Sequence, residues 1–227
     1  MNHLSEWLRS VLDHRDEDIF HMPVYQAFWD TLDPEPGESL LAINCRHTEL
    51  LRSAYNKQLD ACGIHRNREE MKQAQKEALH ATLRLWEGTE IPFHEGSFDY
   101  IFEFDSFECF SDMVAGLNEV KRVLKPNGVF IAVVPNKNFL LSSAYPLSDK
   151  TALSRGYTER SLLQWQKLFQ QTGFEIADQK RGQWYVNYYH ETRGMQQGSN
   201  WKNGLKDILL STLPLKYAHR FVFFLKP

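Results

Sequence analysis

Residues 102–110 (FEFDSFECF) hold the densest group of side chains that could take part in chemistry. Asp105 and Glu108 directly follow an apolar run typical of a buried strand, and a carboxylate in such a place can accept a proton. The alternative is a structural role for the polar residues that follow, with Ser111 or Asp112 capping the next helix. If the protein catalyses a reaction that needs a base, Asp105 and Glu108 are the candidates.

The three cysteines, Cys45, Cys62 and Cys109, lie far apart in the sequence. Their odd number and wide spacing argue against a disulfide framework and against a zinc site. No positioned base is evident beside any of them, so nucleophilic catalysis by cysteine is disfavoured. We expect Cys62 and Cys109 to be buried thiols in a protein of a reducing, cytoplasmic compartment.

An aromatic run, WYVNYYH, occupies residues 184–190 and follows an irregular segment over residues 136–157. The run could line a substrate pocket beneath a lid formed by residues 136–157. An aromatic stripe is more often part of a core or an interface, so both interpretations stay open. The candidate substrate-binding residues are Trp184, Tyr185, Tyr188 and Tyr189.

The composition is that of an ordinary globular domain. The chain has 227 residues, 42% hydrophobic and 24% charged, with a formal net charge of −3. These values exclude a mainly disordered chain, and no stretch approaches the ~20 apolar residues of a membrane span. The first 18 residues lack the features of a secretory signal. The near-neutral charge predicts no nucleic-acid partner.

Short apolar runs alternate with amphipathic segments through the first two thirds of the chain. This alternation predicts a parallel sheet covered by helices on both faces. Lys125–Gly128 (KPNG) is predicted to form a turn before the most strand-like run. The predicted strands are residues 39–43, 59–64, 81–86, 98–104 and 129–134, and the predicted helices are residues 47–57, 68–80 and 111–124.

Both ends of the chain follow a different pattern. Apolar spacing predicts helices at residues 2–13 and 24–32. In the last third, a helix is predicted from Thr158 to Thr172, with Gly173 ending it. The remaining predictions are strands at residues 174–178 and 219–225 and a helical stretch at residues 205–213.

Four passages together resemble the class I S-adenosylmethionine-dependent methyltransferases, in particular members that act on small molecules or lipids. They are IPFHEGSFD (residues 91–99), LNEVKRVLKPNG (residues 117–128), YTE…GFE (residues 157–175) and the tail from residue 213. The resemblance implies an α/β, Rossmann-like fold with a seven-stranded, mostly parallel sheet and an antiparallel last strand. It also implies a cofactor site at the carboxyl ends of the first strands.

The resemblance is weakest in the loop that should hold the cofactor. Asn44, Arg46 and Thr48 stand where the family has glycines, and Ala42 stands where it usually has an acid. Asn44 can still adopt a left-handed conformation. A left-handed conformation at Arg46 would cost roughly 1–2 kcal/mol, and its side chain would point near the space of the cofactor.

Two further positions relate to the cofactor by resemblance. His65 stands where the family has an acid that accepts hydrogen bonds from the ribose, and Glu87 matches an acid near the adenine. Losing a charge-assisted hydrogen bond, together with steric intrusion by Arg46, amounts to about 4 kcal/mol, or a roughly thousandfold weaker dissociation constant. Alternatively, Arg46 and His65 are solvated loop residues, or they fill the site or bind a different, anionic ligand.

The resemblance also suggests places for the remaining candidates. Asp105 and Glu108 would lie beside the methyl group and the acceptor. The amino-terminal helices, which carry Trp7, Phe28 and Trp29, would cap the cofactor pocket or pack elsewhere.

The sequence thus predicts a single methyltransferase-like domain. It comprises an amino-terminal helical cap (residues 1–37), a core sheet with the cofactor half (residues 38–135) and a substrate half with the lid (residues 136–227). Three functions stay open. The first is an S-adenosylmethionine-dependent methyltransferase that acts on a small-molecule or lipid-type acceptor. The second is a catalytically inactive homologue that serves a protein partner. The third is a protein that has recruited the same cleft for another ligand.

Overall fold

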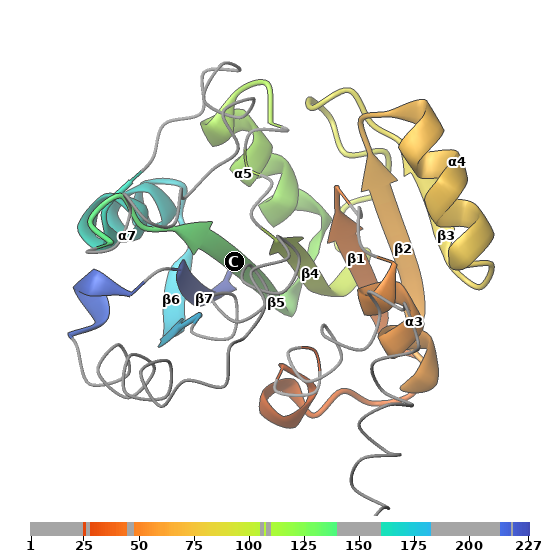
Figure 1. Cartoon of the computed structure of the whole chain (residues 1–227), viewed down its shortest axis with the longest axis horizontal. Helices are drawn as coiled ribbons and strands as arrows, with labels where there is room; N and C mark the ends of the chain where they lie inside the picture. The colour runs from red at the N-terminus through yellow and green to blue at the C-terminus, as the bar shows by residue number, and fades with distance from the viewer. Residues whose placement is uncertain are drawn as a thin grey trace, which may run out of the picture.

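The computed structural model describes Tyr25 and residues 28–44, 48–104, 107, 110–139, 160–182, 214–218 and 220–227. Seven strands form one sheet in the order β3-β2-β1-β4-β5-β7-β6 (Figure 1). All strands run parallel except β7, which is antiparallel to both of its neighbours. The predicted fold class is confirmed. The strands are β1 (Ser39–Ile43), β2 (Asp60–His65), β3 (Thr82–Leu85), β4 (Phe98–Phe104), β5 (Leu124–Pro135), β6 (Glu175–Arg181) and β7 (Arg220–Lys226).

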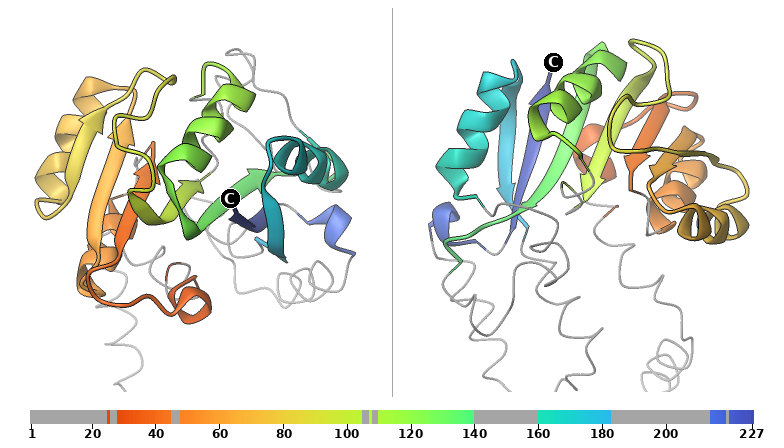
Figure 2. Two further views of the ribbon diagram at one scale, coloured as in Figure 1. Left: turned by 180° about the vertical axis from the view of Figure 1, so that it is seen from behind. Right: turned by 90° about the horizontal axis from the view of Figure 1, so that it is seen from above.

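Helices flank the sheet on both sides (Figure 2). They cover its two faces, which explains why the central strands β1, β4, β5 and β7 are mostly apolar and buried, whereas β3 and β6 at the two ends of the sheet are more exposed. One face packs against α5 and α7, and the other packs against α3. The helices are α3 (Glu49–Asn56), α4 (Arg68–Glu77), α5 (Met113–Val123) and α7 (Leu162–Gln171), and a short 3-10 helix, η2, spans Leu215–Tyr217.

The amino-terminal segment packs on a face of the sheet. Phe28 and Trp29 are buried in helical conformation, and both rings meet Phe102 of β4 edge-on. The indole N–H of Trp29 also donates a hydrogen bond to Ser53 Oγ in α3 (2.6 Å). Two placements were predicted for the amino-terminal helices, over the cofactor pocket or elsewhere. The contacts of Phe28 and Trp29 show this segment packed on the sheet. Trp7 lies outside the described residues.

The main difference from the predicted elements is at Lys125–Gly128. This segment is part of β5, where the pairing with β4 shifts register between Phe98 and Tyr100. Gly128 allows the close approach, because a Cβ there would lie 2.7 Å from the Leu124 side chain and 2.9 Å from the Asp99 carbonyl oxygen. The predicted turn is therefore an irregularity within a longer strand.

Helix α7 ends as predicted and begins later than predicted. Gly173 follows it with φ +79°, the left-handed conformation of a residue that ends a helix. At the start, Ser161 and Gln164 form a capping box, which places the first turn at Leu162 instead of Thr158. The predicted helices at residues 2–13 and 205–213 lie outside the described residues.

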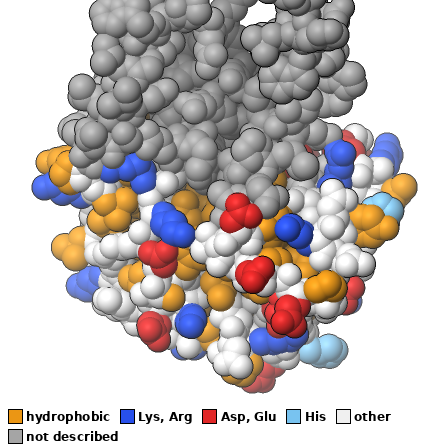
Figure 3. Space-filling model, turned by 90° about the horizontal axis from the view of Figure 1, so that it is seen from below, with side chains coloured by type: hydrophobic (Ala, Val, Ile, Leu, Met, Phe, Trp, Pro, Cys, Tyr) orange, Lys and Arg blue, Asp and Glu red, His pale blue; other side chains and the backbone are white. Residues whose placement is uncertain are grey.

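The surface over the described residues is mixed in character. On the face in Figure 3, acidic, basic and hydrophobic side chains are interspersed. Among the helices of the described ranges, none is long and apolar enough to cross a bilayer.

Candidate functional site

The carboxyl ends of the parallel strands bring the predicted cofactor residues together. Ile43, the last residue of β1, pairs with Ile64 of β2 on one side and with Glu103 of β4 on the other. His65, the last residue of β2, pairs with Leu85 of β3. Asn44, His65 and the segment after β3 therefore lie along one edge, where open α/β sheets bind their ligands.

Asn44 turns the chain in the left-handed conformation that its residue type allows. Its φ is +52° and its side chain is buried. Asparagine tolerates this conformation better than most residues with a Cβ, so the backbone makes a glycine-like turn without a glycine. Arg46, the other altered position of this loop, lies outside the described residues.

The start of α3 lies just beyond this turn. Thr48, which stands at the last glycine position of the resemblance, is buried, and its hydroxyl donates to Glu77 Oε2 (3.0 Å) instead of capping α3. Glu49 follows in the first turn and is also buried, where its negative charge complements the helix dipole. Polar side chains of the protein thus occupy the place where the family has bare backbone.

His65 is buried, with only 2% of its surface exposed, so the interpretation as a solvated loop residue is wrong. Its Nδ1 accepts a hydrogen bond from the Asn67 N–H (2.9 Å), and its Nε2 lies 3.2 Å from Glu70 Oε2. The ring of His65 is therefore held at Nδ1 by a backbone hydrogen bond, and its Nε2 lies close to the carboxylate of Glu70.

The carboxylate of Glu70 is the feature near β2 that sequence reasoning missed. Asn67 caps α4 through its Oδ1, which accepts from the Glu69 and Glu70 N–H groups, and its Nδ2 donates to Glu70 Oε1 (3.2 Å). Glu70 remains 47% exposed. In the sequence, Asn67 and Glu70 are spaced like an N-cap residue and its N3 partner, and this spacing could have indicated the position of Glu70.

The segment after β3 is anchored at both of its ends. The Trp86 N–H donates to the His65 carbonyl (2.9 Å), which holds the segment against β2. The Ser111 N–H donates to the Gly88 carbonyl (3.0 Å), and the Ser111 hydroxyl donates to the Glu87 carbonyl (3.3 Å). Glu87, the residue after Trp86, is exposed. Of the two predicted helix caps, Asp112 is the one that caps α5, through Ala115 N–H (2.9 Å).

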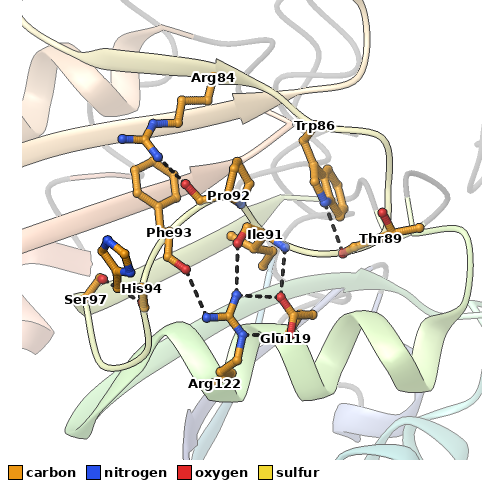
Figure 4. Close-up of polar contacts among 10 residues, drawn as sticks. All are labelled: Arg84, Trp86, Thr89, Ile91, Pro92, Phe93, His94, Ser97, Glu119 and Arg122. Carbon is orange, nitrogen blue, oxygen red and sulfur yellow. Dashed lines mark hydrogen bonds and ion pairs between the residues drawn. The ribbon is translucent and has the colours of Figure 1, made fainter.

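Farther along the same loop, an ion pair on α5 holds the backbone (Figure 4). Arg122 donates to both oxygens of Glu119 and to the carbonyls of Ile91 (2.9 Å) and Phe93 (3.0 Å). The Ile91 N–H donates in turn to Glu119 Oε2 (2.9 Å). The hydrogen bonds from Arg122 hold the pKa of Glu119 below its usual value. Residues 91–99 and 117–128, two of the passages that carry the family resemblance, are therefore hydrogen-bonded to each other.

Glu103 is a second acid that sequence reasoning missed. It lies one residue before the end of β4, between Ile43 of β1 and Ala132 of β5, and its surface is fully buried. A buried carboxylate at this edge is unusual, because burying a charge is costly unless it has partners. In the sequence, Glu103 could have been found as an acid inside the apolar run that precedes Asp105.

Several predicted site residues cannot be placed. Asp105, Glu108, Trp184, Tyr185, Tyr188 and Tyr189 lie outside the described residues, as do Cys45 and Cys109. Cys62 is half-buried, and burial raises the pKa of its thiol, which makes it a weak nucleophile. Within the described ranges, no group of three or more potential metal ligands occurs.

Residues 42–132 match the family model described as a methyltransferase domain. No curated protein matches the chain in sequence. The matched segment begins in β1 and ends in β5, so it contains the whole edge described above.

Solved structures share the fold at low sequence identity. The [4+2]-cyclase SpnF has a TM-score of 0.63 and 16% identity, covering 90% of this chain and 80% of its own. A putative methyltransferase in complex with the Trm112 activator from Haloferax volcanii has a TM-score of 0.61 and 15% identity, covering 93% and 97%. Phosphoethanolamine N-methyltransferase 2 from Haemonchus contortus, in complex with S-adenosyl-L-methionine, has a TM-score of 0.62 and 18% identity, covering 90% of this chain and 52% of its own. Residues 42–132 are thus similar in sequence to a methyltransferase domain, and the chain shares the fold of these solved structures.

Proposed function

We propose that this protein is an S-adenosylmethionine-dependent methyltransferase that acts on a small-molecule or lipid-type acceptor. One observation carries the proposal. The left-handed turn at Asn44 ends β1 beside the end of β2 and the anchored segment Trp86–Gly88. This layout leaves backbone groups of three strands at one edge of the sheet, which suits a ligand of nucleoside size.

The residues at this edge fit the cofactor in part. The turn at Asn44 lets a ligand approach the backbone, and the carboxylate of Glu70 offers the acceptor that His65 lacks. Asn44, Glu70 and Glu87 are the residues we expect to hold the cofactor, together with Arg46 of the same loop. S-adenosylmethionine, when bound, supplies a methyl group on a sulfonium centre.

The contribution of the chain to methyl transfer is mainly orientation of the two reactants. Hydrogen bonds from Trp86 and Ser111 fix the segment that carries Glu87, so the cofactor side is preformed. On the acceptor side, Asp105 or Glu108 is proposed to take a proton where the acceptor requires it. The aromatic residues 184–189 are proposed to line the acceptor pocket.

A second candidate is a related protein that uses the edge without methyl transfer, either as a partner subunit or for another ligand. The burial of His65 favours it, because a ring that is 2% exposed and accepts the Asn67 N–H at Nδ1 offers little to a ribose. One structural neighbour is named as a [4+2]-cyclase and another is in complex with a methyltransferase activator. A shared fold therefore leaves the reaction open.

Thermal unfolding with and without millimolar S-adenosylmethionine separates the two candidates, combined with mass spectrometry of any ligand that copurifies. A methyltransferase should gain thermal stability with the cofactor and with S-adenosylhomocysteine, because a ligand of the folded state stabilises it. No shift with either compound, or a different copurified ligand, would exclude the methyltransferase assignment in favour of the second candidate.

A further inference from the structure

Strand β6 ends the sheet beside helix α7 (Figure 1). Within the part of the chain that the structure describes, β6 pairs with β7 alone. A strand at the end of a sheet presents backbone N–H and C=O groups with which a further strand can pair. The described sheet therefore offers a place for an eighth strand at β6.

Two hydrogen bonds show which backbone groups of β6 point away from β7. The Gly182 N–H donates to the carbonyl of Arg220, the residue that continues the pairing of β6 with β7 (3.0 Å). In an antiparallel pair the hydrogen-bonded residues alternate, so the backbone groups of Lys180 face β7 and those of Gln179 face outward. Accordingly, the Gln179 N–H donates to the side chain of Asp178 (2.7 Å).

A groove of about 700 Å³ lies between β6 and α7. The side chain of Leu163 in α7 is 74% exposed, and Gln166 of α7 donates to Gln179 of β6 (2.8 Å). The residues that line the groove are Leu163, Gln166, Lys167 and Gln170 of α7 and residues 176–179 of β6. A strand added beside β6 would therefore cover part of α7 as well.

The charges of β6 are divided between its two halves. Glu175 and Asp178 stand in the first half, and Lys180 and Arg181 stand in the second. Asp178 and Lys180 are 51% and 45% exposed, and their charged groups lie 3.4 Å apart on one face of the strand. Two copies of such a strand are complementary in charge when they run antiparallel, because the acidic half of each meets the basic half of the other.

Charge also selects the register of such a pair. In a two-fold antiparallel pair, residues opposite each other share a face, so one residue lies opposite its own copy. With Gln179 at that position, Asp178 of each copy lies opposite Lys180 of the other, in the non-hydrogen-bonded pairs whose side chains are closest. Centring the pair on Asp178, Lys180 or Arg181 places a charge opposite the same charge. The regular part of β6 thus favours the register centred on Gln179.

We propose that a second copy of this chain pairs with β6 in this register, so that two sheets join into one. The Gln179 N–H of each copy then leaves the Asp178 side chain and donates to the Gln179 carbonyl of the other copy, and Asp178 pairs with Lys180 across the junction. The two α7 helices lie on the same face of the joined sheet, with Leu163 available for packing. The inference goes beyond the proposed function, because no residue expected to hold the cofactor takes part.

Sedimentation equilibrium of the full chain over a series of concentrations tests the proposal with two charge reversals. Asp178→Lys makes both charged positions of the junction positive, and Lys180→Asp makes both negative. Each variant alone should dimerise at least about tenfold more weakly than the wild type, because two opposite pairs become two like pairs. Mixed in equal amounts, the two variants should associate within about threefold of the wild-type affinity, since each charge again meets its opposite.

The matched controls are charge reversals in an exposed ion pair of α4, beside β3 at the other end of the sheet (Figure 1). Glu69→Lys and Lys72→Asp change the net charge by the same amounts, and each should dimerise within about twofold of the wild type. A wild type that stays monomeric up to about 0.5 mM would overturn the proposal. Equal effects of the β6 and α4 variants, or no recovery on mixing, would also overturn it.

Hydrogen exchange tests the register itself. The amides of Gln179 and Arg181, which point outward in the single chain, should exchange more slowly as the protein concentration rises. Slow exchange at every concentration would place another segment of the same chain on β6 and overturn the proposal. A dimer in which these two amides exchange as fast as in the monomer would overturn it as well.

Discussion

The two halves of the sheet differ in charge and in the side chains that lie at the carboxyl ends of their strands. The half with β1, β2 and β3 is acidic, since the described residues from 30 to 104 contain 14 acids and seven Lys and Arg residues. Its edge carries polar side chains with partners inside the chain: His65 accepts from the Asn67 backbone N–H, and the Thr48 hydroxyl donates to Glu77. The described residues of the half with β5, β7 and β6, from residue 135 on, contain eight Lys and Arg residues and only two acids.

This contrast shows what an average over the chain conceals. A net charge of −3 is close to neutral, yet the chain contains an acidic region and a basic region. Each of the following predictions tests one side of this contrast, beginning with the largest expected effect.

Arg46→Gly combined with His65→Asp should strengthen the binding of S-adenosylhomocysteine by about 100-fold, out of the roughly thousandfold loss expected from the two altered positions. Aspartate can still accept the Asn67 N–H two residues on, so the turn after β2 should persist. Calorimetry measures the change. Arg46→Gly with His65→Asn is the control without the carboxylate, and an equal gain in both variants would show that the charge at residue 65 is irrelevant.

Glu119→Gln should lower the free energy of unfolding by about 2 kcal/mol, because it breaks a charge-assisted pair that also holds the loop backbone at Ile91. Since Arg122 lowers the pKa of Glu119 in the folded state, this stabilisation should be complete above about pH 5. It should shrink as the pH falls through the lowered pKa. Urea unfolding at several pH values measures the difference.

The matched control for the Glu119 prediction is Glu69→Gln, which removes an exposed partner of Lys72. That variant should change stability by less than about 0.5 kcal/mol. A difference between wild type and Glu119→Gln that is the same at pH 3 and pH 7 would contradict the electrostatic account of the loop.

Asn44→Ala should destabilise the protein by about 1 kcal/mol, because alanine tolerates the left-handed conformation less well than asparagine. Asn44→Gly should leave stability close to that of the wild type, since glycine adopts this conformation freely. The midpoints of urea unfolding give the comparison. Equal losses for alanine and glycine would mean that the side chain of Asn44, not its backbone, matters at the end of β1.

Ser111→Ala should have the smallest effect, at about 0.5 kcal/mol, because it removes only the longer of the two hydrogen bonds that Ser111 makes to the loop. The backbone bond to Gly88 remains. Hydrogen exchange at residues 86–88 should rise locally without a change in global unfolding. Unchanged exchange there would show that the hydroxyl does not restrain Glu87.

The sequence allowed much of the fold to be predicted, because strand and helix periodicity is a local property. β1 and β4 have the predicted bounds, and Gly173 ends α7 as expected. The turn predicted at Lys125–Gly128 was wrong because its pairing with β4 is a long-range contact.

The candidate site was less accessible to sequence reasoning. The left-handed turn at Asn44 is compatible with its residue type, and the sequence indicated it as a possibility. The burial of His65 and its approach to Glu70 depend on how α4 begins, and a resemblance by position does not describe that.

The most direct test of the central claim is a calorimetric titration of the wild-type protein with S-adenosylhomocysteine. Binding should saturate with a dissociation constant of about a millimolar, weakened from the micromolar range by the altered loop and His65. The absence of any heat or saturation up to several times that concentration would contradict the assignment of a cofactor site to the carboxyl ends of β1, β2 and β3.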